Sequence, residues 1–348
     1  MITRRRLLGT VGVGASALAL GAASTGRLLA ASGPLTFASW GGTTQDAQAA
    51  AWADPFQEAT GIEVLQDGPT DYGKLKAMVE SGNAVWDVVD VEGDYAFQAA
   101  QMGLLEPIDY SIVKKENLDP RFSFDHGVGS FYYSFVLGYN KDAFGDKAPE
   151  TWADLFDTTK FPGKRTFWKW SSPGVLEVAL LADGVSADQL YPLDLDRAFA
   201  KLDTIKQDIL WWGSGAESQQ LLVSGEAPIG SFWNGRIYAI QQSGMDNIGI
   251  SWNQNLALAD ILVVPKGTKN KDAAMKFLAL ASSPEGQAAF ANATAYAPIN
   301  TAAVPLLDKG MLPLMPFEHT ETQITPDMQY WAENRDAIGE RWYAWQVK

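Results

Sequence analysis

Hydrophobic and polar positions along the chain follow two patterns, one typical of strands and one typical of helices. Short apolar runs bounded by turn residues predict buried strands at 35–40, 62–65, 86–91, 131–137, 227–232 and 256–265. Apolar residues at helical spacing predict helices at 43–60, 72–81, 176–181, 195–205, 271–280 and 331–345. Gly61 follows the first of these helices, at the position where a glycine commonly ends a helix. Strands that alternate with helices predict an α/β protein with a largely parallel sheet and helices on its faces.

The first 31 residues have a different pattern, a basic head followed by a short, weakly apolar stretch rich in glycine and alanine. Arg4, Arg5 and Arg6 precede two leucines, which is typical of a secretory signal peptide that uses the twin-arginine route. The apolar run is shorter than the roughly 20 residues that a membrane-spanning helix needs. We therefore expect residues 1–31 to direct export to the periplasm, and we expect no membrane span after the signal is removed.

The composition narrows the classes of function. The chain has 348 residues, of which 47% are hydrophobic and 20% charged, and this is enough for two folded domains. It has no cysteine and two histidines, which excludes disulfides and thiol nucleophiles and argues against most histidine-based catalysis and metal binding. The net charge of −14 argues against a nucleic-acid partner. Thirteen tryptophans beside an excess of carboxylates instead suit the capture of a small cation.

Four segments of the sequence resemble one known family. They are a T-G-I-x-V strand at 60–64, a G-Y-N segment at 138–140, a P-x-T-W-x-D-L stretch followed by P-G-K at 149–164, and a return strand and helix at 264–274. Together they resemble bacterial extracellular solute-binding proteins, the receptors of ABC importers, over essentially the whole chain after the signal. Within that family, the polyamine and γ-aminobutyrate branch is the most similar.

The resemblance implies a fold and a domain organisation. The fold is α/β and two-lobed, of the periplasmic-binding-protein kind (type II-like), with a ligand cleft between lobes joined by crossing strands. The first lobe is expected at 33–137 plus 262–304, and the second lobe at 138–261. The C-terminal tail, 305–348, is expected to pack on the first lobe.

The resemblance also implies a set of ligand-binding residues. Trp40 matches a tryptophan that stacks on the methylene chain of the ligand, and Gly41 beside it lets a ligand approach the backbone. Trp233 matches a second-lobe tryptophan, and Tyr296 matches a cleft tyrosine. Asp260 matches an aspartate that pairs with an amine. Its place in an apolar strand supports this independently, because a buried aspartate needs a partner.

Two positions depart from the polyamine pattern. Glu92 stands where polyamine receptors usually carry a small hydroxyl residue, and Arg236 stands where they carry an amine-binding aspartate. An arginine there repels a second ammonium group but binds a carboxylate through two parallel hydrogen bonds. The predicted ligand is therefore zwitterionic, as γ-aminobutyrate is. Two plainer interpretations stay open, Glu92 in a solvated acidic loop and Arg236 in an ordinary ion pair at the surface.

Other motifs carry less information. The segment 163–166 superficially resembles a phosphate-binding loop, but it lacks the upstream glycine and is interpreted as a surface turn. Adjacent tyrosines, Tyr132 and Tyr133, raise the alternative of a ferric site. Neighbouring strand residues face opposite sides, however, which favours packing. Trp168 and Trp170 both lie near the expected cleft, and the sequence does not decide which of them faces it.

We predict a periplasmic receptor, not an enzyme, that delivers a small amine-containing solute to the membrane permease of an ABC importer. The ligand is expected to be a polyamine (putrescine or spermidine) or an ω-amino acid such as γ-aminobutyrate. No cofactor, metal or nucleic acid is expected, and a monomer is expected because no heptad repeat appears. The alternative is an exported hydrolase that acts on amines or glycans through paired carboxylates among Asp87, Asp90, Glu92 and Asp94.

Overall fold

The computed structural model describes residues 33–348, and the predicted signal peptide at 1–31 lies outside the described residues. The strands in the described part form one sheet, in the order β2-β1-β3-β9-β5-β8-β6-β7, with β4 paired to β5. Their bounds are β1 (Leu35–Ala38), β2 (Val64–Asp67), β3 (Val88–Glu92), β4 (Ser123–Phe124), β5 (Gly127–Asn140), β6 (Arg165–Trp168), β7 (Ile209–Trp212), β8 (Ile229–Trp233) and β9 (Ile248–Val263).

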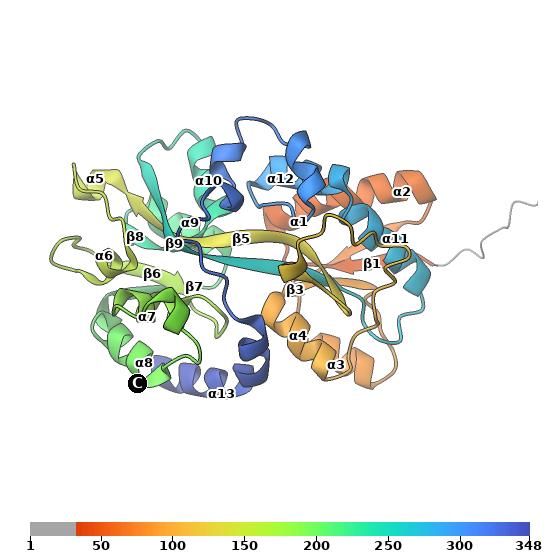
Figure 1. Ribbon diagram of the computed structural model, residues 1–348, viewed down its shortest axis with the longest axis horizontal. Coiled ribbons are helices and arrows are strands. Elements are labelled where there is room, and N and C mark those ends of the chain that lie inside the picture. Colours follow the sequence, from red (N-terminus) through yellow and green to blue (C-terminus); the bar gives the residue numbers. More distant parts are fainter. Residues whose placement is uncertain (1–32) are drawn as a thin grey trace, which may run out of the picture. The chain divides into compact units, whose positions relative to one another are not determined.

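The sheet is mixed, so the expectation of a largely parallel sheet is wrong at its centre. β1 pairs in parallel with β2 and β3, and β6 pairs in parallel with β7 and β8. Between these groups, β9 and β5 run antiparallel to each other and to their outer neighbours β3 and β8. β5 and β9 have 14 and 16 residues and extend from one group to the other (Figure 1). We call the part around β1–β3 the first lobe and the part around β6–β8 the second lobe.

Helices lie on both sides of the crossing strands (Figure 1). The α-helices are α1 (Gly42–Gln48), α2 (Asp54–Thr60), α3 (Tyr72–Glu80), α4 (Gly93–Gln101), α5 (Lys141–Phe144), α6 (Trp152–Phe156), α7 (Val175–Ala182), α8 (Leu195–Asp203), α9 (Gly215–Val223), α10 (Asn234–Gln242), α11 (Lys271–Ala281), α12 (Pro284–Thr294) and α13 (Met328–Gln346). Short 3-10 turns lie at 120–122, 187–189, 206–208, 301–306, 312–314 and 316–318. Within residues 33–348, no helix combines the length and apolar character needed to cross a bilayer.

The helix predicted at 43–60 is present as a continuous run of α1, a π-helical segment (Ala49–Ala53) and α2. Gly61 ends it with a φ of 71°, a left-handed conformation that glycine adopts without strain. Trp52 lies in the π-helical segment, is fully buried, and donates its indole N–H to the Gly286 carbonyl at 2.9 Å. This contact fixes the helix against α12.

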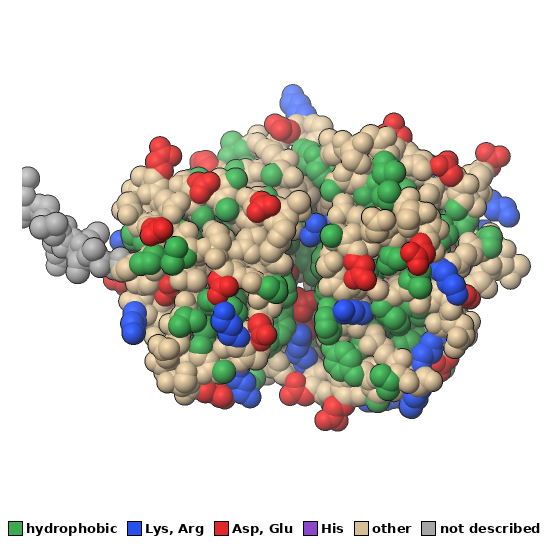
Figure 2. Space-filling model, turned by 180° about the vertical axis from the view of Figure 1, so that it is seen from behind, with side chains coloured by type: hydrophobic (Ala, Val, Ile, Leu, Met, Phe, Trp, Pro, Cys, Tyr) green, Lys and Arg blue, Asp and Glu red, His purple; other side chains and the backbone are tan. Residues whose placement is uncertain are grey.

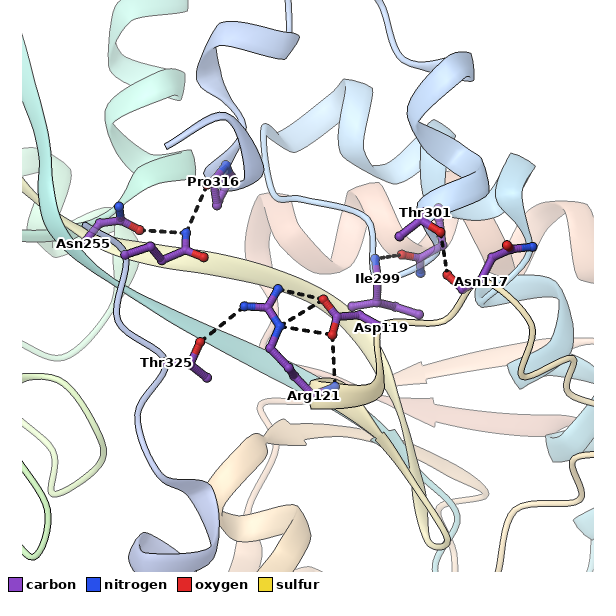
Figure 3. Close-up of polar contacts among 10 residues, drawn as sticks. Asn117, Asp119, Arg121, Asn255, Ile299, Thr301, Pro316 and Thr325 are labelled. Atoms are coloured by element: carbon purple, nitrogen blue, oxygen red, sulfur yellow. Dashed lines mark hydrogen bonds and ion pairs between the residues drawn. The ribbon is translucent and has the colours of Figure 1, made fainter. Parts of the chain in front are cut away.

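The chain after α12 returns across the crossing strands and is tied to them. The backbone N–H of Ile324 donates to the Asn255 carbonyl of β9 at 2.9 Å, and Gln323 Nε2 donates to Asn255 Oδ1 at 2.9 Å. Arg121, just before β4, donates to Thr325 Oγ1 at 3.3 Å (Figure 3). The tail therefore crosses from the first lobe to the second lobe alongside β9.

Helix α13 does not pack on the first lobe alone, so the expectation for the tail was incomplete. Three of its indole N–H groups find acceptors in the second lobe: Trp331 to Glu177 Oε1 at 2.6 Å, Trp342 to the Lys169 carbonyl at 2.8 Å, and Trp345 to Asp203 Oδ1 at 2.8 Å. It also contacts α4 of the first lobe, where Gln98 Nε2 donates to Asp336 Oδ1 at 3.2 Å. Figure 1 shows α13 lying along both α8 and α4.

Candidate ligand-binding cleft

A cavity of about 780 Å³ lies between the two lobes, with walls from both lobes and from α13. Figure 2 shows the surface hollowed at this boundary, with basic and acidic side chains visible inside the hollow. All seven residues predicted for the site line this cavity: Trp40, Gly41, Glu92, Trp233, Arg236, Asp260 and Tyr296. Trp168 and Trp170 also line the cavity, so both of these tryptophans face the cleft.

These residues meet because β3 and β8 run in opposite directions and their carboxyl ends, with the helices that follow them, face each other across the crossing strands. Trp40 and Gly41 connect β1 to α1, Glu92 connects β3 to α4, and Trp233 connects β8 to α10. Arg236 lies in the first turn of α10. In open α/β sheets, ligand sites form outside the carboxyl ends of the strands for this reason.

The acidic end of the cavity is built by β3 and β9. Glu92 lies directly opposite Asp260 in the antiparallel register of these strands, so the two side chains share one face of the sheet. Burial raises the pKa of Asp260 well above its usual range, and the neighbouring Asp90 and Glu92 carboxylates raise it further. The indole N–H of Trp40 faces Asp260 and counteracts this rise, but it makes no hydrogen bond of normal geometry. Within residues 33–348, Asp260 takes part in no ion pair.

Glu92 is not part of a solvated acidic loop, and the plainer interpretation of this residue is wrong. Its Oε2 accepts a hydrogen bond from the Tyr72 hydroxyl at 3.0 Å and lies 3.7 Å from Arg335 Nη2. Asp94 is buried and forms an ion pair with the same arginine. The acidic cluster is thus partly neutralised by a residue of α13.

Two further carboxylates of this cluster serve the fold. Asp90 is fully buried, accepts a hydrogen bond from Gln48 Nε2 at 2.6 Å, and has its pKa raised by burial to about 7. Asp87 accepts hydrogen bonds from the backbone N–H of Thr36 at 2.8 Å and from Asn270 Nδ2 at 3.1 Å. Neither Asp87 nor Asp90 lines the cavity, so neither pairs with Glu92 in the way that a carboxylate-dependent hydrolase requires.

Arg236 reaches from α10 across the cleft to α1, so it is not in an ordinary surface ion pair. Its Nη1 donates to Thr43 Oγ1 at 3.1 Å and its Nη2 donates to Thr44 Oγ1 at 3.2 Å. Its Nε is buried and has no hydrogen-bond partner within the described residues. A Cβ at Gly215 would lie 2.1 Å from this Nε, so a glycine there is what gives the guanidinium its space. A buried, unpaired N–H of a charged group is costly unless an acceptor arrives.

Aromatic rings form the walls between the two charged ends. Trp233 packs against Trp168 at 5.0 Å and against Tyr133 at 5.9 Å between ring centroids, and its buried indole N–H lacks a partner among residues 33–348. On the opposite wall, Trp40 meets Tyr72 edge-to-face at 6.1 Å. Rings at these distances give a rigid apolar slot that suits a methylene chain.

Sequence reasoning missed several residues of the cavity. Tyr133 lines it, whereas Tyr132 faces away and stacks on Phe122 at 5.4 Å, which confirms that the adjacent tyrosines face opposite sides. Arg335 and Tyr343, both from α13, also line the cavity. The alternation of the strand could have indicated Tyr133, but no local pattern indicates that α13 reaches the cleft.

The residues of the sequence match a model of a known family at 51–314, and that family is described as bacterial extracellular solute-binding protein. The chain belongs to this family. A γ-aminobutyric acid-binding protein of Pseudomonas aeruginosa is 35% identical over 323 residues, which cover 90% of this chain and 91% of that protein. A spermidine/putrescine-binding periplasmic protein of Escherichia coli is 25% identical and covers 73% of this chain and 75% of its own length.

The fold of this chain is also similar to solved structures of solute-binding proteins. The structure of a GABA (γ-aminobutyrate) receptor is 65% identical, has a TM-score of 0.87, and covers 90% of this chain and 98% of its own. The predicted two-lobed α/β fold and the predicted role in solute binding are confirmed. The alternative of an exported hydrolase finds no support among these relatives.

Proposed function

We propose that this protein is the receptor of an ABC importer and that it binds a small zwitterionic amine, γ-aminobutyrate or a close ω-amino acid. The observation that carries the proposal is that, among residues 33–348, one cavity is lined both by a carboxylate without an ion pair, Asp260, and by a guanidinium with an unpaired N–H, Arg236. Relatives named for γ-aminobutyrate binding, one of them 65% identical, support the same ligand class.

Both charges act on one residue of the cavity, Tyr296, and this sets the kind of ligand. Burial raises the pKa of the Tyr296 hydroxyl, Arg236 lowers it, and Asp260 raises it, so both charges are close to this ring. A ligand that contacts both therefore carries its ammonium and carboxylate groups a short methylene chain apart. Trp40 and Trp233 lie where they can pack on that chain.

A linear polyamine fits this arrangement less well. Its second ammonium would lie beside Arg236, and two like charges in a water-poor cavity repel strongly. A carboxylate there instead takes hydrogen bonds from a guanidinium, which is the stronger charge-assisted kind.

Calorimetric titration of the purified protein with γ-aminobutyrate and putrescine tests the ligand class. We expect γ-aminobutyrate to bind more tightly, to change tryptophan fluorescence, and to yield no product. At a ligand concentration 100 times the dissociation constant, the free energy of unfolding should rise by about 2.7 kcal/mol. Tighter binding of putrescine, or turnover of either compound, would overturn the proposal.

The setting in which the receptor acts is part of the same proposal. Residues 1–31 direct export to the periplasm by the twin-arginine route, and the mature chain is a monomer whose lobes (33–137 plus 262–304, and 138–261) close over the ligand and present it to the permease. Replacing Arg4, Arg5 and Arg6 with lysine should leave the protein out of the periplasmic fraction. Light scattering that finds a stable dimer would reject the monomer.

A further inference from the structure

We propose that Arg335, supplied by the C-terminal helix α13, is a specificity-determining residue that restricts the cleft to ligands with a single ammonium group. The inference rests on the proposed function and deepens it, because it names the residue that keeps the acidic end of the cavity from accepting a second positive charge.

Arg335 is held firmly at the cavity wall. Its Nη1 forms an ion pair with the buried Asp94, and its Nη2 lies 3.7 Å from Glu92 Oε2. The guanidinium carbon lies 5.2 Å from the centre of the Tyr72 ring and 5.7 Å from that of Tyr95, and these two rings stack on each other. Ion pair and cation–π contacts together fix the charge in place.

The helix that carries this arginine is itself anchored outside the acidic cluster. Trp331 and Trp342 of α13 donate their indole N–H groups to acceptors of the second lobe. Arg335 then reaches the acids of the first lobe from this support. A positive charge presented by a packed helix cannot withdraw easily when a competing cation arrives.

Arg335 determines how many carboxylates of the cavity are left without a compensating positive charge. Three carboxylates line the cavity: Asp71, Glu92 and Asp260. Asp71 is exposed to water and caps α3 by accepting from the Lys74 backbone N–H, and Glu92 is compensated by Arg335. Asp260 alone among the three is buried and has no ion pair within residues 33–348, so the cavity offers one place for an ammonium group.

Without Arg335, the same cavity would suit a diamine. Glu92 and Asp94 would then both be uncompensated, and a second ammonium could take the place of the guanidinium. Arg236 discriminates at the far end of the ligand, whereas Arg335 sets how many positive charges the near end accepts.

The test compares dissociation constants for γ-aminobutyrate and putrescine in the wild type and in four variants, measured by calorimetry. In Arg335→Gln, we expect the ratio to move toward putrescine by at least about tenfold, mainly through tighter putrescine binding. Arg335→Lys keeps the charge and should keep the wild-type ratio. Arg341→Gln is the matched control, because Arg341 is also on α13 and pairs with Asp196 outside this cavity. It should leave the ratio unchanged.

Arg335→Gln leaves the buried Asp94 without its partner, which can destabilise the fold. The double variant Arg335→Gln, Asp94→Asn removes that charge as well, and it should still show the shift because Glu92 stays uncompensated. A ratio that does not move in either variant, or a loss of γ-aminobutyrate binding with no gain for putrescine, overturns the proposal. A wild type that prefers putrescine rejects the proposed function instead, and the shift caused by Arg335→Gln still decides the role of this arginine.

Discussion

Within residues 33–348, the buried Nε–H of Arg236 has no acceptor, so the role of Arg236 in binding depends on which group accepts this hydrogen bond. If a ligand carboxylate does, Arg236→Ala should weaken γ-aminobutyrate binding by at least about thirtyfold, the low end of the cost of removing one partner of a desolvated charged pair. Arg236→Asp should shift preference toward putrescine. Calorimetry on both variants measures this.

The control for Arg236 is an arginine whose ion pair lies away from the cleft. Arg197 pairs with Asp183 and does not line the cavity. Arg197→Ala should bind γ-aminobutyrate as the wild type does. Equal binding by Arg236→Ala and Arg197→Ala would mean that Arg236 has only a structural role through Thr43 and Thr44.

Asp90 makes the stability of the ligand-free protein depend on pH. Burial raises its pKa from 3.8 to about 7 in the folded protein, so between these values the folded state keeps a proton that the unfolded chain releases. The unfolded state then binds fewer protons, and the stability contributed by this group falls as the pH rises. Between pH 5 and pH 7.5, we expect the free energy of unfolding of the wild type to fall by about 2 kcal/mol more than that of Asp90→Asn. Urea unfolding at both pH values measures this difference. Parallel pH profiles for the two proteins would contradict this.

Residues that act within their own segment could be predicted, and residues that act across the chain could not. Asp260 is visible in the sequence because a carboxylate in an apolar strand stands out against its neighbours, whereas Trp40 was assigned through the resemblance to the family. Arg335 is one of several charged residues on an exposed-looking helix. Its partner Asp94 lies 241 positions earlier, and no local pattern connects them.

At the scale of elements, apolar spacing predicted part of the secondary structure but not how the strands pair. The predicted segments overlap β1, β2, β3, β5, β8 and β9, whereas β6, β7 and helices such as α4 and α10 were not predicted. Periodicity gives the type of an element and says nothing about its neighbours. The antiparallel centre of the sheet arises because β5 and β9 pair with each other along most of their length. The path of the tail likewise depends on hydrogen bonds to Asn255 that no spacing rule encodes.

Glu177 anchors α13, and its removal should loosen that helix. This fully buried carboxylate accepts hydrogen bonds from the Trp331 indole at 2.6 Å, the Tyr191 hydroxyl at 2.6 Å and the Gly174 backbone at 2.8 Å. Glu177→Ala leaves two buried donors and the half-buried Tyr191 hydroxyl without this acceptor, and it should lower the free energy of unfolding by about 2–4 kcal/mol. Denaturant unfolding measures this loss. Hydrogen exchange should become faster in α13 of the variant than in α13 of the wild type, and the increase should be smaller in α2. Unchanged exchange in α13 would show that the tryptophans hold the helix without Glu177.

At the scale of the whole molecule, the two lobes share β5 and β9, and this should make them unfold together. Neither lobe can lose its part of the sheet without exposing the strand edges of the other. Calorimetry should therefore give one transition, with equal calorimetric and van't Hoff enthalpies. Two resolved transitions would mean that the lobes are independent folding units.

The shared strands also impose an order on how the chain matures during synthesis. β3 ends at Glu92, but the strand that completes its pairing, β9, begins at Ile248. Domains usually fold in order from the N-terminus as they emerge. Most of the first lobe is translated early, but its sheet cannot complete its strand pairing until β9, which follows the second lobe in the sequence, has been synthesised. A nascent chain that stops at residue 247 should therefore stay sensitive to protease throughout its first lobe.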